Sequence, residues 1–578
     1  MNSHLLSDAA IRQFIVDGYV QVQTELPESV HRAIFEKTDA IFSKIRSPEV
    51  EWAYNPLNNV LPVVPELQQV MDAPQVRGAL TSLLGPGYVM LPHRHCHPNF
   101  AKPESSVADG RKLIMGIHKD GHAGGQKPRH RVPRWAILFY YPQACPDEQG
   151  PTVIVPRSHY QHNLARQGDA DPNLTLAARG DGSYGLPEHY IHRTMLPLAG
   201  GLGAVSIMHF DVGHSVIENL ARQHRYGQKF VFMRTEEPEA ATWDNRVEHW
   251  EQPDVAAIPD HEILWTYIWN WMSGGADRFR RGAGVRLQRH TAGELIGLLS
   301  APEPAQRLQA ANELGFLRAT AAETEGTVAA LVRALRDEYE PVRLNAAYAL
   351  GAVGTPALAP LLELLATDAA FYEFDPVTHV SIAAHALGAM GGAAVDALAE
   401  RLTADGEHTR SWAAYALGEI GRPSAGALPQ LLAAARDDKS ANVRRHALSA
   451  AGIVAVPGDG VEEALLERLA NEPDSELRQY VLQALFRIGP TGSGGIPPLA
   501  TALGDGDGYV AAYAAEQLFR TGTPEAFAAL VPYLRGQRWF PHEPVSEQRI
   551  TERRERARTQ RLAKRRRAPE LTVTVGGG

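Results

Sequence analysis

The second half of the chain repeats itself, and this constrains its fold more than any other feature. A helical motif of the form A-x-x-L-G, or a close relative, recurs seven times at intervals of 36, 37, 30, 31, 37 and 33 residues. Such a period is typical of solenoids, in which each unit stacks on its neighbours. The repeated leucines are Leu314, Leu350, Leu387, Leu417, Leu448, Leu485 and Leu518.

Each repeat pairs two helices, for example VRLNAAYALGAVG with LAPLLELLATD. Small residues on one helix of the pair allow close approach, and a glycine after it ends the turn. One pair cannot bury its apolar face alone, whereas a stack can. The pattern resembles the short HEAT-like repeats of phycobilisome-lyase-type proteins from about residue 300 to 535. An ordinary helical bundle is the alternative, but a bundle does not need a fixed period.

The first half of the chain has a different character. It carries most of the tryptophan and histidine, and its short apolar runs are separated by Gly, Pro and Asp. Several short strands with long loops favour a sandwich or a barrel. Residues 8–17 have helical spacing and end at Gly18, which predicts a helix before the first strand. The other strand candidates are 87–91, 135–141, 152–155, 204–208 and 229–233.

Composition limits the class of protein. At 578 residues the chain should form more than one domain, and 44 % hydrophobic with 21 % charged residues is ordinary for a globular protein. A net charge of −9 argues against nucleic-acid binding. Two cysteines favour a reducing, cytoplasmic setting. The N-terminus has no signal-peptide pattern and no run of 18 apolar residues occurs, so we expect no membrane span.

These patterns predict a multidomain protein. We expect a β domain over 1–275, a Gly/Arg-rich linker over 276–295, an all-α solenoid over 296–540 and a tail over 541–578. The tail has nine basic and two acidic residues between Thr551 and Arg567. Such runs are usually solvated or disordered, and an acidic partner or RNA is the alternative.

Candidate metal ligands lie in two segments of the first half. His118 and Asp120 are two residues apart, so in a strand both side chains face one side and can reach one metal. Two imidazoles and one carboxylate suit a non-haem Fe(II) oxygenase. The H-x-D spacing alone is weak, because His209 and Asp211 form a second match. A distal His214 follows, with Asn219 and Arg225 after it.

The order of these segments resembles the phytanoyl-CoA dioxygenase family of Fe(II)- and 2-oxoglutarate-dependent oxygenases over residues 8–240. In that family H-x-D is followed by a Trp strand, an N/Q-G-x-x-x-V-x-P-G-S-H segment, and a second histidine with an Arg eleven residues later. This sequence departs from the family pattern at Arg157, at Phe210 and at the Ser215–Val216 pair. The counterparts here are Gln149, Gly150, Pro156, Ser158, His159, His209, His214, Asn219 and Arg225.

The resemblance implies a double-stranded β-helix (jelly-roll, cupin-like) with flanking helices. It implies that His118, Asp120 and His214 bind Fe(II), and that 2-oxoglutarate and O2 are cosubstrates. Arg225 is implied to pair with the distal carboxylate of 2-oxoglutarate. The resemblance also places Trp135 and Ser215 at the cosubstrate pocket.

The implied reaction is hydroxylation of an unactivated C–H bond in a small-molecule or carrier-bound substrate. Ala-, Arg- and Gly-rich composition favours bacterial secondary metabolism as the setting. The same metal centre could instead desaturate, epoxidise or cyclise its substrate. Two further alternatives are a HEAT scaffold with an inactive oxygenase domain, and an oxygenase whose HEAT repeats dock a protein partner or carrier.

Overall fold

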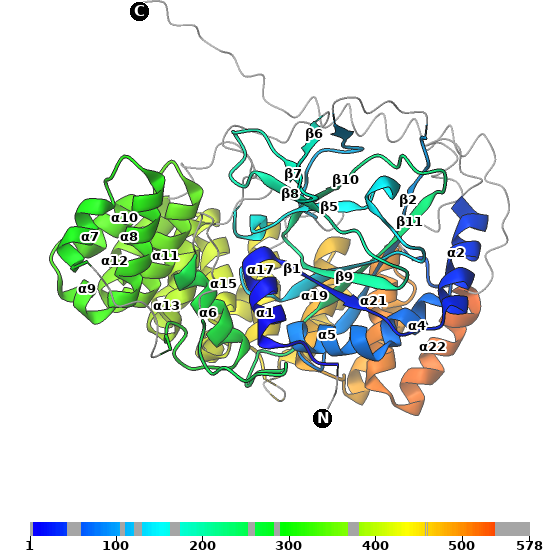
Figure 1. Ribbon diagram of the computed structural model, residues 1–578. Helices are drawn as coiled ribbons and strands as arrows, with labels where there is room; N and C mark the ends of the chain where they lie inside the picture. Colours follow the sequence, from blue (N-terminus) through cyan, green and yellow to red (C-terminus); the bar gives the residue numbers. More distant parts are fainter. Residues whose placement is uncertain are drawn as a thin grey trace, which may run out of the picture.

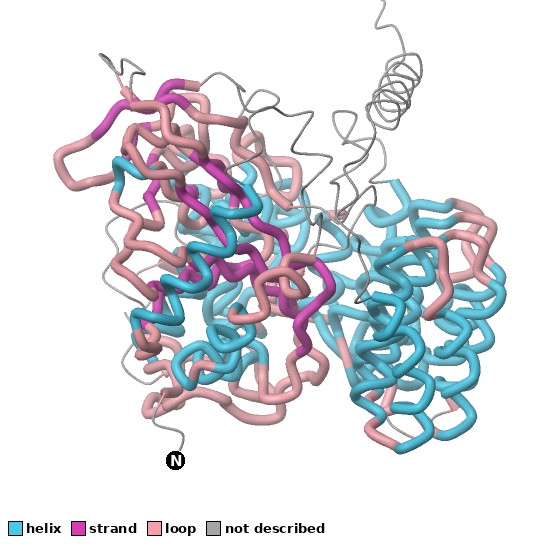
Figure 2. The backbone as a smooth tube through the Cα atoms, turned by 90° about the vertical axis from the view of Figure 1, so that its right-hand side faces the viewer, coloured by secondary structure: helices cyan, strands magenta, loops and turns pink. Residues whose placement is uncertain are grey.

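A computed structural model gives the architecture of the chain. It describes residues 4–42, 59–103, 110–120, 130–161, 174–251, 261–282, 290–367, 381–456, 458 and 460–537. Strands gather in the N-terminal part and stacked helices form the C-terminal part (Figures 1 and 2). The predicted basic tail, 541–578, lies outside the described residues.

The sheet of the β domain with the longer strands, called the larger sheet below, has five antiparallel strands in the order β1-β9-β4-β11-β2. All five strand candidates of the sequence fall in strands, four of them here, but β2 is much longer than the predicted 87–91. Its extension, HRHCHPN, is polar and so lacks the apolar alternation that marks a strand. The strands are β1 (Tyr19–Gln23), β2 (Val89–Asn99), β4 (Trp135–Tyr140), β9 (Ala204–His209) and β11 (Arg225–Met233).

A second sheet has six short strands in the order β10-β5-β8-β7-β6-β3. An isolated antiparallel bridge between Leu113, just after β3, and Ile217, just after β10, joins the two edge strands of this sheet. The strands are β3 (Arg111–Lys112), β5 (Thr152–Val155), β6 (Thr175–Ala178), β7 (Tyr184–Gly185), β8 (Thr194–Pro197) and β10 (Gly213–Val216).

Helices flank the β domain, as the sequence predicts. The helix expected at 8–17 begins after Ser7, whose side chain accepts a hydrogen bond from the N–H of Ala10, and ends at Gly18 with φ 84°. Positive φ is accessible to glycine without steric cost, which explains the stop at this residue. The helices are α1 (Asp8–Asp17), α2 (Glu28–Phe42), α4 (Leu67–Asp72), α5 (Pro74–Leu84) and α6 (Glu262–Met272), with 3₁₀ turns η1 (Asp147–Gln149) and η2 (Ser158–Tyr160).

The C-terminal helices form the predicted stack. The motif helices contact one another in chain order, and all seven motif leucines are completely buried. The motif helices are α8 (Pro304–Leu317), α11 (Glu340–Val353), α13 (Ile382–Met390), α15 (Glu407–Ile420), α17 (Ala441–Val454), α19 (Ser475–Ile488) and α21 (Gly508–Thr521). The other helices are α7 (Ala292–Leu298), α9 (Ala319–Glu323), α10 (Thr327–Ala334), α12 (Leu358–Thr367), α14 (Val395–Arg401), α16 (Leu428–Asp437), α18 (Val461–Asn471), α20 (Ile496–Ala502) and α22 (Pro524–Gln537), with 3₁₀ turns η3 (Thr355–Ala357), η5 (Gly391–Ala394), η6 (Arg422–Ala427) and η7 (Ser493–Gly495).

Glycine makes this close stacking possible. A Cβ on Gly452 of α17 would lie 2.7 Å from the Cα of Ala484 on α19, which is closer than carbon atoms pack. A Cβ on Gly418 of α15 would likewise lie 3.1 Å from the Cα of Ala450 on α17. At the end of α11, Gly354 has φ 80°, so the predicted glycine stop is present.

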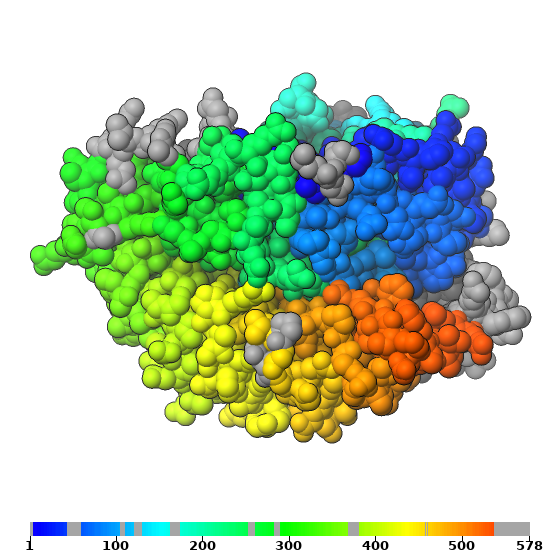
Figure 3. Space-filling view, turned by 90° about the horizontal axis from the view of Figure 1, so that it is seen from below, coloured from blue at the N-terminus to red at the C-terminus, as the bar shows by residue number. Residues whose placement is uncertain are grey.

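The β domain packs along the HEAT array (Figures 1 and 3). Near the start of the array, the backbone N–H of Ile263 on α6 donates to Asn312 on α8 at 2.7 Å. Near its end, Tyr509 on α21 is hydrogen-bonded to His93 on β2 at 2.9 Å. Both contacts involve a helix that carries the repeated A-x-x-L-G motif, α8 or α21. This face of the array is therefore partly covered by the chain's own N-terminal domain.

The middle of this interface carries buried charge. Glu419 of α15 is hydrogen-bonded to His130 and forms an ion pair with Arg134 at 3.6 Å. Arg134 also pairs with Glu237, and its guanidinium lies 5.2 Å from the centre of the Trp271 ring. A buried charge without a partner is costly, so these groups depend on both domains being in place.

The described part of the predicted linker is packed. Asp277 forms an ion pair with Arg318 at 2.7 Å, and Arg281 pairs with Glu262 at 2.6 Å. Phe279 is buried against Tyr267. Within the residues that the structure describes, one stretch, Ile382–Arg401, is long and apolar enough to span a membrane, and 61 % of its 18-residue apolar window is buried.

Candidate metal centre

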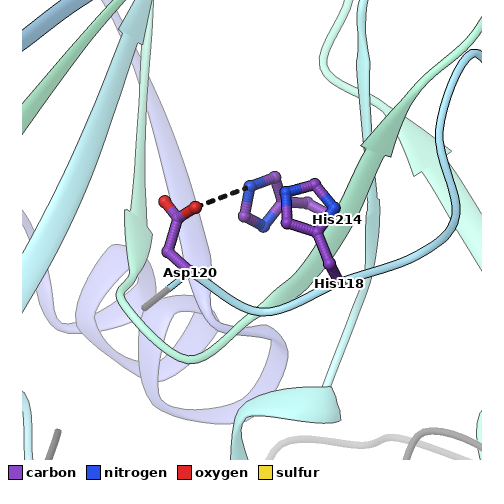
Figure 4. Close-up of side chains that lie close together, drawn as sticks. All are labelled: His118, Asp120 and His214. Atoms are coloured by element: carbon purple, nitrogen blue, oxygen red, sulfur yellow. Dashed lines mark ion pairs between the residues drawn. The ribbon is translucent and has the colours of Figure 1, made fainter. Parts of the chain in front are cut away.

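The backbones of His118 and His214 form an isolated antiparallel bridge. The N–H of His118 donates to the carbonyl of His214 at 3.0 Å, and the N–H of His214 donates back at 2.9 Å. Directly paired residues of antiparallel strands present their side chains on the same face. The two imidazole rings accordingly lie 4.5 Å apart, centre to centre (Figure 4).

Each imidazole is oriented by its own backbone. Nδ1 of His118 lies 3.1 Å from the carbonyl oxygen of Gly116, and Nδ1 of His214 lies 3.0 Å from that of Val212. An Nδ1–H donated to a carbonyl fixes the tautomer in which Nε2 is a free acceptor. Burial lowers the pKa of His214 to about 4 even though Asp120 lies nearby, so this ring is neutral at neutral pH. A neutral imidazole is the form that binds a metal.

Asp120 completes the group. Its Oδ1 lies 3.8 Å from Nε2 of His214, and its other oxygen, Oδ2, is ion-paired with Lys229 (Figure 4 shows the first contact). Burial favours the neutral acid, but Lys229 and the two histidines outweigh it and hold the pKa of Asp120 below its usual range. One ligand atom from each of the three residues lies within 4.8 Å of the others. Among the residues that the structure describes, no other group of three or more His, Cys, Asp or Glu side chains is arranged this way.

The second H-x-D match lies elsewhere in the β domain. His209 ends β9, and its Nδ1 accepts a hydrogen bond from the backbone N–H of Asp211 at 3.2 Å. Its ring packs against His159, 4.9 Å away between centres, and against Phe14. The structure therefore brings His214 together with His118 and Asp120, and not with His209 and Asp211.

The three residues assigned to cosubstrate lie in buried positions with protein partners. Arg225 begins β11, and its guanidinium donates to the carbonyls of Gly150 at 2.7 and 3.1 Å and of His97 at 3.1 Å. Ser215 donates its hydroxyl to the carbonyl of Met115. Trp135 packs against Phe210, with ring centres 6.0 Å apart.

Sequence reasoning missed a basic row on the inner face of the larger sheet. His95 and His97 of β2 lie 4.5 Å apart, centre to centre, and His95 is paired across the sheet with Lys229. The H-x-H-x-H alternation of HRHCH could have indicated this row, because residues i and i+2 of a strand share a face. His93, the first of the three, is the residue that reaches Tyr509 of the HEAT array.

One protein family matches the C-terminal part of the chain. The sequence model of HEAT repeats matches residues 293–373, 376–452 and 462–540. No curated protein matches the chain.

Several solved structures show a weak likeness. They include a structure titled "Non-heme monooxygenase, ThoJ-Ni complex", 16 % identical, which covers 40 % of this chain and 82 % of that chain with a TM-score of 0.27. The non-heme alpha ketoglutarate dependent carbocyclase SnoK from nogalamycin biosynthesis is also 16 % identical, over 40 % and 85 %, with a TM-score of 0.27. AviO1 from Streptomyces viridochromogenes Tue57 is 14 % identical, over 40 % and 95 %, with a TM-score of 0.26. The C-terminal repeats of this chain are HEAT repeats.

Proposed function

We propose that the chain is an iron(II)- and 2-oxoglutarate-dependent oxygenase. One observation carries the proposal, namely the convergence of His118, Asp120 and His214 with both Nδ1 atoms on backbone carbonyls. Two imidazoles and a carboxylate on one face are the donor set of non-haem Fe(II) oxygenases. The donors fit the metal chemically, and they come from segments fixed to each other by backbone hydrogen bonds.

The fold that we propose for residues 1–275 is the double-stranded β-helix implied by the family resemblance. Two antiparallel sheets whose strands come from distant parts of the sequence support it. In this arrangement the three candidate ligands would hold the metal between the two sheets. His214, on β10 of the smaller sheet, and Lys229, on β11 of the larger, both approach Asp120.

The residues of the chain perform the binding and orienting steps. Bound Fe(II) with 2-oxoglutarate and O2 supplies the oxidising chemistry that hydroxylates a C–H bond. His118, Asp120 and His214 would hold the metal on one face and leave its other face to cosubstrate and O2. Arg225 keeps two guanidinium N–H groups beyond those used on Gly150 and His97, so it can still donate hydrogen bonds to the distal carboxylate.

The substrate that we propose is a small molecule, free or carried by a protein. Ile114 and Met115, just before His118, are large apolar side chains that are 47 % and 46 % exposed. An exposed apolar pair beside a polar metal site favours a substrate with an apolar part. The HEAT array would dock a carrier or a protein partner, and we place the protein in the cytoplasm.

Anaerobic titration with Fe(II) and 2-oxoglutarate tests the proposal. We expect one metal ion to bind per chain, and 2-oxoglutarate to produce a visible charge-transfer band on the Fe(II) protein. On exposure to O2, succinate should form. A chain that binds no metal, or that binds metal without any response to 2-oxoglutarate, would be a HEAT scaffold with an inactive oxygenase domain. If succinate forms, analysis of the substrate-derived product would distinguish hydroxylation from desaturation, epoxidation and cyclisation.

A further inference from the structure

Lys229 of β11 reaches the candidate metal centre from the larger sheet. It is 5 % exposed and lies in the middle of β11, between Phe139 of β4 and His95 of β2. Its ammonium group is ion-paired with Oδ2 of Asp120. The strand pairing on both sides fixes the backbone of Lys229, so only its flexible side chain can move.

The pair of Lys229 and Asp120 is electrically neutral as it stands. A divalent cation bound by Asp120 would place two positive groups around one carboxylate in a buried site, where charges interact more strongly than in water. Lys229 therefore opposes the binding of a metal alone. A dianion that binds together with the metal would restore the charge balance of the site, because it brings two negative charges.

Arg225 lies on the same face of the same strand. Residues i and i+4 of a strand point the same way, about 13 Å apart along the backbone. Lys229 lies at the metal end of this face and Arg225 at the far end, where it donates to the carbonyls of Gly150 and His97. Two cations in line on one strand suit a dicarboxylate lying along it, with one end at the metal.

We propose that Lys229 changes partner when the site is filled, leaving Asp120 for the metal-bound carboxylate of the cosubstrate. Lys229 thereby couples the binding of metal to the binding of the 2-oxo acid, while Arg225 recognises the distal carboxylate. This inference rests on the proposed function, and it adds a residue that the family resemblance does not assign.

The test measures binding with Mn(II), which replaces iron without redox chemistry, by isothermal titration calorimetry. Two ligands are compared, 2-oxoglutarate and pyruvate, since pyruvate keeps the 2-oxo carboxylate but lacks the distal one. The variants are Lys229→Met, Arg225→Met and, as a control for loss of charge, Lys102→Met, whose side chain is exposed. Lys229→Gln serves as a second variant if Lys229→Met does not fold by circular dichroism.

We expect Lys229→Met to bind Mn(II) alone at least as tightly as the wild type. Both 2-oxoglutarate and pyruvate should then bind the Mn(II) protein about 30-fold more weakly, as expected for loss of a buried charge partner. Arg225→Met should weaken 2-oxoglutarate but leave pyruvate within about threefold, and Lys102→Met should change neither.

Two results would overturn the inference. If Lys229→Met weakens Mn(II) binding in the absence of ligand, Lys229 is a fixed support for Asp120. If it leaves the affinities for both 2-oxo acids unchanged, Lys229 has no part in recognising them. Failure of the wild type to bind Mn(II) at all would instead reject the proposed function, so the two failures can be told apart.

Discussion

His118 and His214 are joined by two reciprocal backbone hydrogen bonds of 3.0 and 2.9 Å. Their side chains lie side by side because their backbones are paired, so the geometry of the site depends on strand pairing. One side-chain rotamer at each histidine is then enough to point Nε2 toward a metal, since Nδ1 is held by the carbonyl oxygen two residues earlier.

Asp120 and Asp211 should differ sharply in metal binding. Asp120→Ala removes one of three ligands, and we expect the affinity for Fe(II) or Mn(II) to fall at least about 100-fold, beyond the loss typical of an outer-shell change. Asp211→Ala should keep the wild-type affinity, because its segment packs with His159 and Phe14. Equilibrium dialysis under anaerobic conditions measures both. Loss of metal in Asp211→Ala with retention in Asp120→Ala would reverse the assignment.

Gly452 should be intolerant of a side chain despite lying in a helix. Alanine normally stabilises a helix by up to about 1 kcal/mol relative to glycine. Here the added Cβ meets Ala484 at 2.7 Å, so Gly452→Ala should lower the free energy of unfolding by about 1–3 kcal/mol through overpacking.

The matched control is Gly297→Ala in α7, where a Cβ would meet no atom within 4 Å. This variant should be neutral or slightly stabilising. Urea denaturation followed by circular dichroism compares the two. Equal effects at both positions would show that the close approach of α17 and α19 does not restrict the side chain at position 452.

Glu419 should make the contact between the two domains sensitive to acid. Burial alone would raise the pKa of Glu419, but His130 and Arg134 outweigh it and lower the pKa to about 2. A carboxyl whose pKa is depressed in the folded state stabilises the fold above its unfolded pKa of about 4.3. That stabilisation is lost as the pH falls from about 4.3 to 2.

Glu419→Gln should therefore cost about 2–4 kcal/mol at pH 7, and the cost should shrink as the pH falls below 4. Urea denaturation of both proteins at pH 7, 5 and 3 measures the difference. Glu400→Gln, at an exposed position on α14, is the control and should have little effect at any pH. A cost for Glu419→Gln that does not depend on pH would mean that lost packing, and not charge, is responsible.

The repeat unit and the helix stops were predictable because they are local. The spacing of Leu314 to Leu518 reports which side of each helix is buried, and glycines such as Gly354 report the backbone conformation of one residue. The extension of β2 through His97 was not predictable from apolar alternation, because its inner face carries histidines that pack in a basic row.

The sequence alone determined that a HEAT array follows a β domain, and that His118, Asp120 and His214 are candidate ligands. It could not choose between two H-x-D matches by spacing, because both have the same period. Only the tertiary structure decided that His118 pairs with His214, that Lys229 reaches Asp120, and that Glu419 of the array meets Arg134 of the β domain. These are contacts between residues distant in sequence, and they follow from strand pairing and domain packing, which no local pattern records.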